Sequence, residues 1–285
     1  MHTFSEAFYL LKNQLLPIYD DRESTAIAHE LLNHITSQSK FDRLINKSQL
    51  FTTQQQLAFE KATLELLAGK PLQYVIGNAW FMEHEFIVNE HVLIPRPETE
   101  ELVQWIVADY KDAWELTLLD IGTGSGCIPV SLKLALPQAQ ITACDISENT
   151  LEVAATNATK LNANITFIGI DILDPEQQNN LGSYNVIVSN PPYIPVSERE
   201  NMHSNVKDHE PGIALFVPSD DALLFYRTIA QLGKSHLEPE GCIYCELESS
   251  HGEQSKALFE EMGYKNVEIR KDMHGNWRML KAVNN

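Results

Sequence analysis

Residues 118–126, LLDIGTGSG, constrain the fold more than any other segment, because an apolar strand runs directly into three glycines at alternate positions. The apolar pattern that follows predicts a helix from Cys127 to Leu136, which Pro137 ends. Glycines let a backbone turn sharply and approach a ligand closely, here with a helix N-terminus behind the turn. The segment is therefore predicted to bind a cofactor through Gly122, Thr123, Gly124, Ser125 and Gly126.

Strand-like and helix-like segments alternate from residue 96 onward. Strands are predicted at 118–121, 141–144, 165–170, 184–189, 241–247, 267–270 and 279–282, and helices at 99–110, 127–136, 147–161, 221–236 and 253–262. Alternation of this kind predicts an α/β fold in which helices cover both faces of a parallel sheet. Ligands then bind beyond the carboxyl ends of the strands.

Two acidic residues end the strands that follow the glycine loop. Asp145 stands about 20 positions after the loop and suits the diol of a ribose. Asp171 ends the third strand and is predicted to accept a hydrogen bond from an adenine amine; the alternative is an ordinary turn residue at a strand end. The G-x-G-x-G spacing differs from the dinucleotide G-x-G-x-x-G. Taken alone, the loop leaves NAD, FAD and S-adenosylmethionine open.

The tetrapeptide Asn-Pro-Pro-Tyr follows the fourth predicted strand. Its two prolines fix φ and supply no N–H, so the turn presents carbonyl oxygens outward. The side-chain carbonyl of Asn190 and the backbone carbonyl of Pro191 can together accept both hydrogens of an incoming NH2 group. A planar amide or an exocyclic amine needs this orientation before its nitrogen attacks a methyl group, which favours S-adenosylmethionine. The predicted substrate-binding residues are Asn190, Pro191, Pro192 and Tyr193; Asn190, Pro191 and Tyr193 are predicted to be catalytic, and Asn190 also to contact the cofactor.

The first 72 residues are predicted to be helical only. Thr3 with Glu6 forms a capping box, and Thr53 with Gln56 is predicted to cap a later helix. The apolar stripes predicted to face inward are Phe4, Phe8, Leu11 and Leu15; Ile27, Leu31, Leu32 and Ile35; Phe41, Leu44 and Ile45; and Leu57, Leu64 and Leu67. Strand-like segments at 74–77 and 86–89 predict a hairpin. We expect a helical substrate-recognition domain at 1–72, a β-hairpin linker at 73–95 and a catalytic domain at 96–285.

The formal net charge of −18 is concentrated in one part of the chain. Residues 1–75 hold seven basic and eight acidic side chains, so about −17 lies in the part that carries the glycine loop. Such a field repels phosphate backbones and attracts basic partners, so direct nucleic acid binding is not expected. The chain has no run of 18 apolar residues and no basic-then-apolar start, which predicts a cytoplasmic protein without a membrane segment.

The cysteines and histidines do not predict a metal site. Cys242 and Cys245 face opposite sides of one predicted strand, and no second pair completes a zinc site. We expect both of them, with Cys127 and Cys144, to be buried thiols. The ten histidines show no H-E-x-x-H spacing.

Further motifs extend along the chain: residues 71–77 with Phe81, residues 93–100 (LIPRPETE), residues 120–126, residues 190–194 (NPPYI), Glu210 with Ala214 and Leu215, Glu246, and residues 272–278 (DMHGNWR). Together they resemble the HemK/PrmC family, the release factor glutamine methyltransferases, over nearly the whole length. The resemblance implies a seven-stranded, Rossmann-like S-adenosylmethionine-dependent methyltransferase domain with an antiparallel last strand, preceded by a small helical domain and a hairpin. The substrate that it implies is the glutamine of the Gly-Gly-Gln motif in bacterial peptide chain release factors, with S-adenosylhomocysteine as the second product.

Several positions depart from the pattern of this family, among them residues 216–221 (FVPSDD), which replace a usual glycine-rich stretch. Members often carry an aromatic residue beside the adenine where this chain has Ile172, so we expect weaker stacking there. Glu248 and His251 stand where the family commonly has Gly and Gln. These departures concern the rim of the pocket and leave the reaction unchanged.

Three rival functions differ in what they predict. A ribosomal protein glutamine methyltransferase shares every motif named above. A nucleic acid amine methyltransferase predicts a basic groove or an inserted recognition domain, and this chain has neither. A catalytically silent scaffold predicts degraded motifs, whereas those of this chain are intact.

Overall fold

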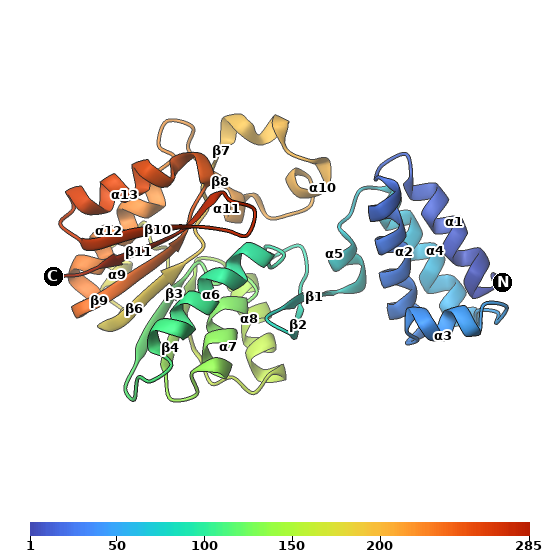
Figure 1. The fold of residues 1–285 in the computed structure, drawn as a ribbon, viewed down its shortest axis with the longest axis horizontal. Coiled ribbons are helices and arrows are strands. Elements are labelled where there is room, and N and C mark those ends of the chain that lie inside the picture. The colour runs from blue at the N-terminus through green and yellow to red at the C-terminus, as the bar shows by residue number, and fades with distance from the viewer. The chain divides into compact units, whose positions relative to one another are not determined.

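The computed structural model describes all 285 residues and divides into two compact units. The first unit comprises Met1–Asn78 together with His203–His209, and the second comprises Ala79–Met202 together with Glu210–Asn285. Figure 1 labels the elements of both. Each unit has its own hydrophobic core.

The first unit is a helical bundle. Its helices are α1 (Phe4–Leu15), α2 (Asp21–Thr36), α3 (Lys40–Ile45), α4 (Thr53–Leu67), α5 (Leu72–Ile76) and, from later in the chain, α10 (Ser204–Lys207). The predicted capping box at the start of α1 is present, with Thr3 and Glu6 bonding each other's backbone N–H groups. The stripes predicted on α1 and α2 are confirmed, since Leu11 and Leu32 are fully buried and Phe8 packs on the same core.

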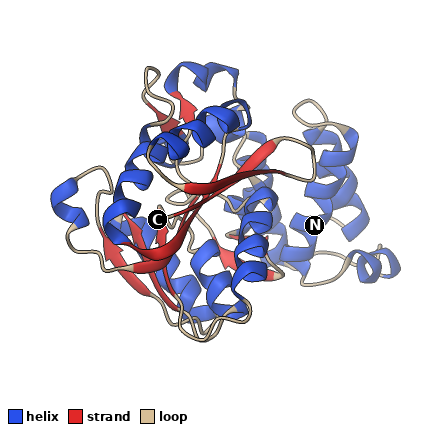
Figure 2. Ribbon diagram, turned by 60° about the vertical axis from the view of Figure 1, so that its left-hand side comes forward, coloured by secondary structure: helices blue, strands red, loops and turns tan.

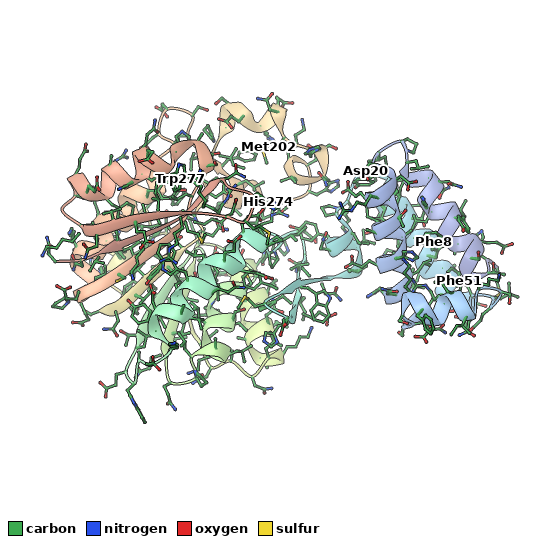
Figure 3. The ribbon with its side chains drawn as sticks, in the orientation of Figure 1. Phe8, Asp20, Phe51, Met202, His274 and Trp277 are labelled. Atoms are coloured by element: carbon green, nitrogen blue, oxygen red, sulfur yellow. The ribbon has the colours of Figure 1, made fainter.

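The stripe predicted on α4 is wrong, because the helix turns a different face inward. Leu57 and Leu64 are 62% and 70% exposed, whereas Phe59 and Leu66 are buried. The Phe59 ring packs on Phe51, with 5.5 Å between centroids (Phe51 is labelled in Figure 3), and this large pair sets the phase of the helix. The N-cap is also one residue earlier than predicted, at Thr52 with Gln55.

The stripe predicted on α3 is exposed as well. Phe41, Leu44 and Ile45 are 60–70% exposed. The side chain that buries itself is Arg43, whose guanidinium donates to the backbone oxygens of His29 and Gln38. These bonds orient the short helix, so its apolar side chains point outward.

The strand predicted at 74–77 is a helix, and the hairpin lies further along the chain. Helix α5 begins after Pro71 and ends at Gly77, whose φ of 79° is left-handed. Leu72 is buried in the helical core, and this packing outweighs the β-branched composition of the segment. The hairpin is formed by β1 (Asn78–Phe81) and β2 (His84–Ile87). Its two-residue turn, Met82 and Glu83, has positive φ at both positions, as a type I′ turn requires.

The second unit is built on one seven-stranded sheet, which confirms the α/β fold. Its strands are β3 (Thr117–Ile121), β4 (Gln140–Asp145), β5 (Thr166–Gly169), β6 (Tyr184–Ser189), β9 (Leu237–Glu246), β10 (Lys265–Lys271) and β11 (Trp277–Val283). They lie in the order β10-β11-β9-β6-β3-β4-β5. All neighbours from β9 to β5 are parallel, and β11 is antiparallel to both β9 and β10. The antiparallel last strand is as predicted.

Helices cover both faces of this sheet (Figure 2). One face packs on α6 (Pro97–Tyr110), α7 (Cys127–Ala135) and α8 (Glu148–Lys160), and the other on α12 (Leu224–His236) and α13 (Gly252–Glu261). Alternate strand residues enter the two cores, as Leu118 and Leu119 show. Cys242 and Cys245 enter opposite cores in the same way, and all four cysteines are buried and free, as predicted.

Shorter elements connect the strands. They are α9 (Pro175–Gln178), β7 (Ile194–Pro195), the 3-10 helix η1 (Val196–Asn201), α11 (Gly212–Leu215), β8 (Phe216–Val217) and the 3-10 helix η2 (Ser249–His251). Strands β7 and β8 pair in parallel. None of the helices is long and apolar enough to cross a bilayer.

Candidate active site

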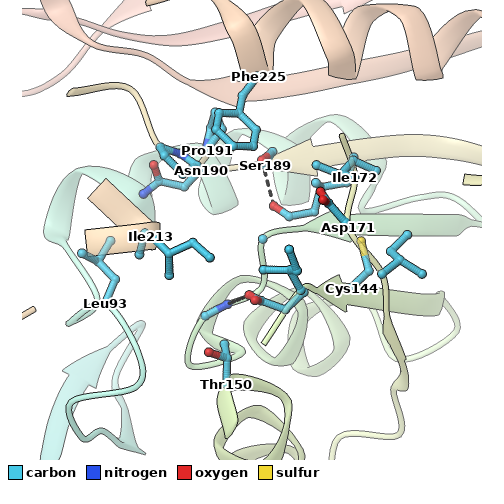
Figure 4. Close-up of a pocket in the computed structure, with 18 of the residues that line it drawn as sticks. Leu93, Cys144, Thr150, Asp171, Ile172, Ser189, Asn190, Pro191, Ile213 and Phe225 are labelled. Carbon is cyan, nitrogen blue, oxygen red and sulfur yellow. Dashed lines mark hydrogen bonds between the residues drawn. The ribbon is translucent and has the colours of Figure 1, made fainter. Parts of the chain in front are cut away.

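A cavity opens at the carboxyl ends of β3, β4 and β6 in the second unit (Figure 4). This is the point where the strand order reverses on either side of β3, the place where open α/β sheets bind ligands. The predicted site residues that line the cavity are Gly122, Gly124, Asp145, Asp171, Ile172, Asn190, Pro191 and Pro192. The predicted residues outside the lining are Thr123, Ser125, Gly126 and Tyr193.

The glycine loop joins β3 to α7 with three left-handed glycines. Gly122, Gly124 and Gly126 have φ values of 71°, 56° and 79°. The N–H groups of Gly122 and Thr123 donate to the carbonyl of Cys144 at 2.9 and 3.0 Å, which ties the loop to β4. A Cβ at Gly122 or Gly124 would meet no protein atom within 4 Å, so both positions leave open space beside the cavity. The loop therefore forms a cradle that side chains would fill.

Asp145, at the end of β4, braces this loop. Its carboxylate accepts the N–H of Gly124 and the N–H of Ser147, both at 3.1 Å. Burial raises the pKa of Asp145, and these backbone donors oppose that shift. Each carboxylate oxygen has a second lone pair, so Asp145 keeps acceptor capacity toward the cavity.

Asp120, at the middle of the parallel sheet, has no access to the cavity. It is completely buried, and burial raises its pKa to about 7. Neither of its carboxylate oxygens has a clear hydrogen-bond partner. The residue lies behind the glycine loop and does not line the cavity.

Asp171 and Ile172 lie at one side of the cavity, and Asn190 and Pro191 lie at another (Figure 4). One carboxylate oxygen of Asp171 accepts the N–H of Leu173 at 2.9 Å. Apolar side chains surround this acidic residue, with Ile172 buried. A cavity with an open glycine cradle, an apolar wall and two carboxylate acceptors fits a nucleoside-bearing sulfonium compound such as S-adenosylmethionine.

Asn190 extends from the end of β6 and connects the cavity to a buried carboxylate. Its Nδ2 donates to Thr99 Oγ1 at 3.2 Å, and Thr99 Oγ1 donates to Glu246 Oε2 at 2.5 Å. The hydroxyl of Tyr193 donates to the other oxygen of Glu246 at 3.3 Å. Tyr193 thus lies behind Asn190 and packs on one of the sheet cores.

Glu246 and the segment 93–100, which contains Thr99, are among the family motifs in the sequence, but neither residue had a predicted role. Glu246 ends β9, the strand beside β6, so an acidic residue at that strand end was the signal that could have found it. It is 1% exposed, and burial raises its pKa to about 7. Thr99, in the first turn of α6, was singled out only as part of the motif 93–100.

An ion pair holds one rim of the cavity. Arg96 contacts Glu210 at 2.5 Å, and the other oxygen of Glu210 accepts the N–H of Ile94 at 3.3 Å. The pair joins the segment before α6 to the segment that begins α11. Leu93 and Ile213, from these two segments, both line the cavity.

The structure contains no group of three or more His, Cys, Asp or Glu side chains that could hold a metal ion.

A glycine-rich loop after β3, at the switch point of a seven-stranded sheet with an antiparallel β11, defines a Rossmann-like fold, and the matches that follow show it to be that of an S-adenosylmethionine-dependent methyltransferase. Two family models match the chain: the Methyltransferase small domain at residues 99–207 and the PrmC N-terminal domain at residues 11–77. The release factor glutamine methyltransferase of Flavobacterium psychrophilum is 39% identical, with 94% of each chain covered. That of Bacteroides thetaiotaomicron is 39% identical over 95% of this chain and 97% of its own. That of Lactococcus lactis is 41% identical over 81% and 84%.

The chain belongs to the release factor glutamine methyltransferase family. It is an enzyme, and the resemblance predicted from its motifs is confirmed.

Proposed function

We propose that this enzyme transfers a methyl group from S-adenosylmethionine to the side-chain amide nitrogen of the glutamine in the Gly-Gly-Gln motif of bacterial release factors. The names of the curated relatives support this substrate. The main structural support for this reaction is the position of Asn190. It lines the cavity, its Nδ2 is bonded inward to Thr99, and the structure shows no partner for its Oδ1.

The catalytic residues act by orienting the substrate. The lone pair of an amide nitrogen is delocalised into its carbonyl, so the nitrogen is a poor nucleophile. Hydrogen bonds from its two N–H groups to Asn190 Oδ1 and to the backbone oxygen of Pro191 raise its electron density and favour its pyramidal form. Pro192 keeps the turn rigid because its φ is fixed, and Tyr193 supports the turn from behind. Alignment of this kind is worth effective molarities on the order of 10⁵ M or more.

S-adenosylmethionine, when bound, supplies an electrophilic methyl group. The amide nitrogen would form its new C–N bond as the C–S bond breaks, with the electron pair left on sulfur and one proton released from nitrogen to solvent. No general base is needed, because that proton becomes acidic only after the methyl group has arrived.

The cofactor is proposed to lie along the glycine cradle. Residues 122–126 would hold its methionine part, and Asp145 would accept hydrogen bonds from the ribose hydroxyls. Asp171 would accept a hydrogen bond from the adenine amine, and Ile172 would pack beside the base. Thr123, Ser125 and Gly126 contribute by shaping the loop, since they lie outside the cavity lining.

The helical first unit is proposed to recognise the release factor. It contains none of the residues that line the cavity and carries no cofactor motif.

The test incubates the full-length enzyme with methyl-labelled S-adenosylmethionine and three substrates in parallel: an intact release factor, its Gly-Gly-Gln variant with Gln replaced by Ala, and a ribosomal protein mixture. We expect label on the intact release factor only, and peptide mapping should place it on that glutamine. Label on a ribosomal protein glutamine, or none on the release factor, contradicts the proposed substrate.

A further inference from the structure

Two hydrogen bonds connect the substrate-facing amide of Asn190, through Thr99, to the buried carboxylate of Glu246, and a third joins Tyr193 to the same carboxylate. The two connecting bonds run from Asn190 Nδ2 to Thr99 Oγ1 at 3.2 Å and from Thr99 Oγ1 to Glu246 Oε2 at 2.5 Å, and the third runs from Tyr193 Oη to Glu246 Oε1 at 3.3 Å. The participating side chains come from α6, from the end of β9 and from the turn after β6. Glu246 is 1% exposed.

The donors available fix the direction of each bond. A carboxylate only accepts, so the single hydroxyl proton of Thr99 points at Glu246. The 2.5 Å distance is that of a hydroxyl donating to a charged oxygen. Thr99 Oγ1 then offers only lone pairs to Asn190, and a lone pair can bind the NH2 end of the amide but not its carbonyl. Asn190 Oδ1 is thereby left for the cavity.

The alternative orientation of Asn190 has nearly the same shape, because the two ends of an amide differ little in size. Packing alone therefore does not favour one orientation of the Asn190 amide over the other. A flipped Asn190 would turn its NH2 group toward the NH2 group of a glutamine substrate. Two donors would then face each other, and each buried donor left unpaired costs about 1–3 kcal/mol.

We propose that Thr99 and Glu246 are positioning residues that hold the Asn190 amide with its oxygen toward the substrate. The inference rests on the proposed function and deepens it, because it states what makes the site specific. A site polarised in this way accepts a nitrogen that carries two hydrogens and disfavours a group that can only accept.

The charge of Glu246 controls the direction of the hydrogen bonds that run from Glu246 through Thr99 to Asn190. A protonated carboxyl group can donate to Thr99, which frees the hydroxyl proton to donate to Asn190 Oδ1 and reverses the orientation. Burial raises the pKa of Glu246 to about 7. The titratable and charged groups near it are Glu98 on α6, Cys127 on α7, Tyr193, Tyr226 on α12 and Arg278 on β11. Glu98 raises the pKa of Glu246 further and Arg278 lowers it.

The test compares Thr99→Val with Thr99→Ser in the full-length enzyme, on intact release factor at saturating S-adenosylmethionine. Valine keeps the shape of threonine without the hydroxyl, whereas serine keeps the hydroxyl. We expect Thr99→Val to lower kcat by about tenfold or more, the rate equivalent of one hydrogen bond, with KM for S-adenosylmethionine within about twofold. Thr99→Ser should recover most of the turnover. A Thr99→Val enzyme with wild-type kcat, or a Thr99→Ser enzyme equally slow, overturns the proposal.

Thr228→Val on α12 is the matched control, because the Thr228 hydroxyl bonds only the Leu224 carbonyl of its own helix. It should keep the wild-type kcat. The pH dependence of kcat is a second test. The kcat of the wild type should fall as pH drops below about 7, because Glu246 becomes protonated. Glu246→Gln should be slower than the wild type at high pH and should not show this fall. A wild-type profile that stays flat through pH 7 counts against Glu246.

A third arm needs no substrate. In ¹⁵N-labelled wild-type protein, the side-chain NH2 of Asn190 should show slowed hydrogen exchange, and Thr99→Val should abolish this protection. An unprotected Asn190 in the wild type overturns the proposal. A wild-type enzyme that leaves release factors unmethylated contradicts the proposed function instead, so the two failures are distinguishable.

Discussion

Asn190 is the side chain on which the chemical step is expected to depend most. Asn190→Ala removes the acceptor Oδ1 and should lower kcat by about 10²–10³-fold, the usual loss when one oriented polar group is removed from a reacting centre. Cofactor affinity, measured by calorimetry, should change little. Asn180→Ala, at an exposed position beyond α9, is the control with the same change in chemistry. A near wild-type rate for Asn190→Ala would remove Asn190 from the mechanism.

Glu246 is expected to lower stability while it supports turnover. Its pKa is about 7 in the folded protein against 4.5 ordinarily, so the folded state holds this proton more tightly than the unfolded state does. Stability therefore falls as pH rises from about 4.5 to 7, and the loss is complete above pH 7. Glu246→Gln carries no such charge, so its Tm should exceed that of the wild type at pH 8.5, with the gap closing near pH 4.5. A wild type that is the more stable protein at pH 8.5 contradicts this expectation.

The sequence could predict residues that stand at strand ends, but it could not predict the hydrogen bonds that support them. Gly122, Asp145 and Asn190 each follow an apolar run, and parallel strands bring their carboxyl ends to one edge. Thr99 and Glu246 are 147 residues apart, and their hydrogen bond depends on how α6 packs against β9. No local pattern encodes a contact of that range.

Within the glycine loop, Gly124 and Gly126 should respond differently to the same substitution. Both have left-handed φ values, which cost an L-residue about 1–2 kcal/mol. A Cβ at Gly126 would also meet Ala154 of α8 at 3.1 Å, whereas one at Gly124 would meet no protein atom within 4 Å. Gly126→Ala should therefore lower Tm more, and Gly124→Ala should mainly weaken S-adenosylmethionine binding, because Gly124 lines the cavity. Thermal unfolding and calorimetry measure the two effects; equal Tm losses would contradict the difference.

At the scale of elements, type and order were easier to predict than helix phase. The alternation of strands and helices after residue 96 gave the sheet, since apolar runs between turn residues are a local signal. The phase of α4 depends on the contact between Phe59 and Phe51. Phe51 lies before the helix, so the apolar spacing within α4 does not reveal this contact. In α5, burial of Leu72 overrides a strand-like composition. Helix α10 joins the first unit from more than 120 residues away, which no pattern within the segment reveals.

At the scale of the whole molecule, the first unit is proposed to recognise the substrate. Substitutions on its surface should therefore weaken substrate binding without changing cofactor binding. Leu57 and Leu64 are exposed on one face of α4, and exposed apolar groups of this kind often mark a binding surface. Leu57→Glu with Leu64→Glu should keep Tm and S-adenosylmethionine affinity but lower kcat/KM on intact release factor. Arg22→Glu, at an exposed position on α2, makes the same change of two charges and is the control. If kcat/KM falls equally in both variants, the change of charge alone explains the loss and the two leucines are not a recognition surface.

The charge of the whole chain should influence how fast the enzyme meets its substrate. About −17 of the formal net charge of −18 lies outside residues 1–75, in the part that holds the cavity. A release factor glutamine that works beside ribosomal RNA is expected to have basic surroundings, so the two fields attract each other. Added salt weakens such attraction, because the Debye length falls from about 10 Å at 0.1 M to about 3 Å at 1 M. We therefore expect kcat/KM for release factor to fall with ionic strength while KM for S-adenosylmethionine changes little. If kcat/KM stays constant from low to high salt, with the fold intact by circular dichroism, the negative charge keeps the protein soluble and does not speed its association with the release factor.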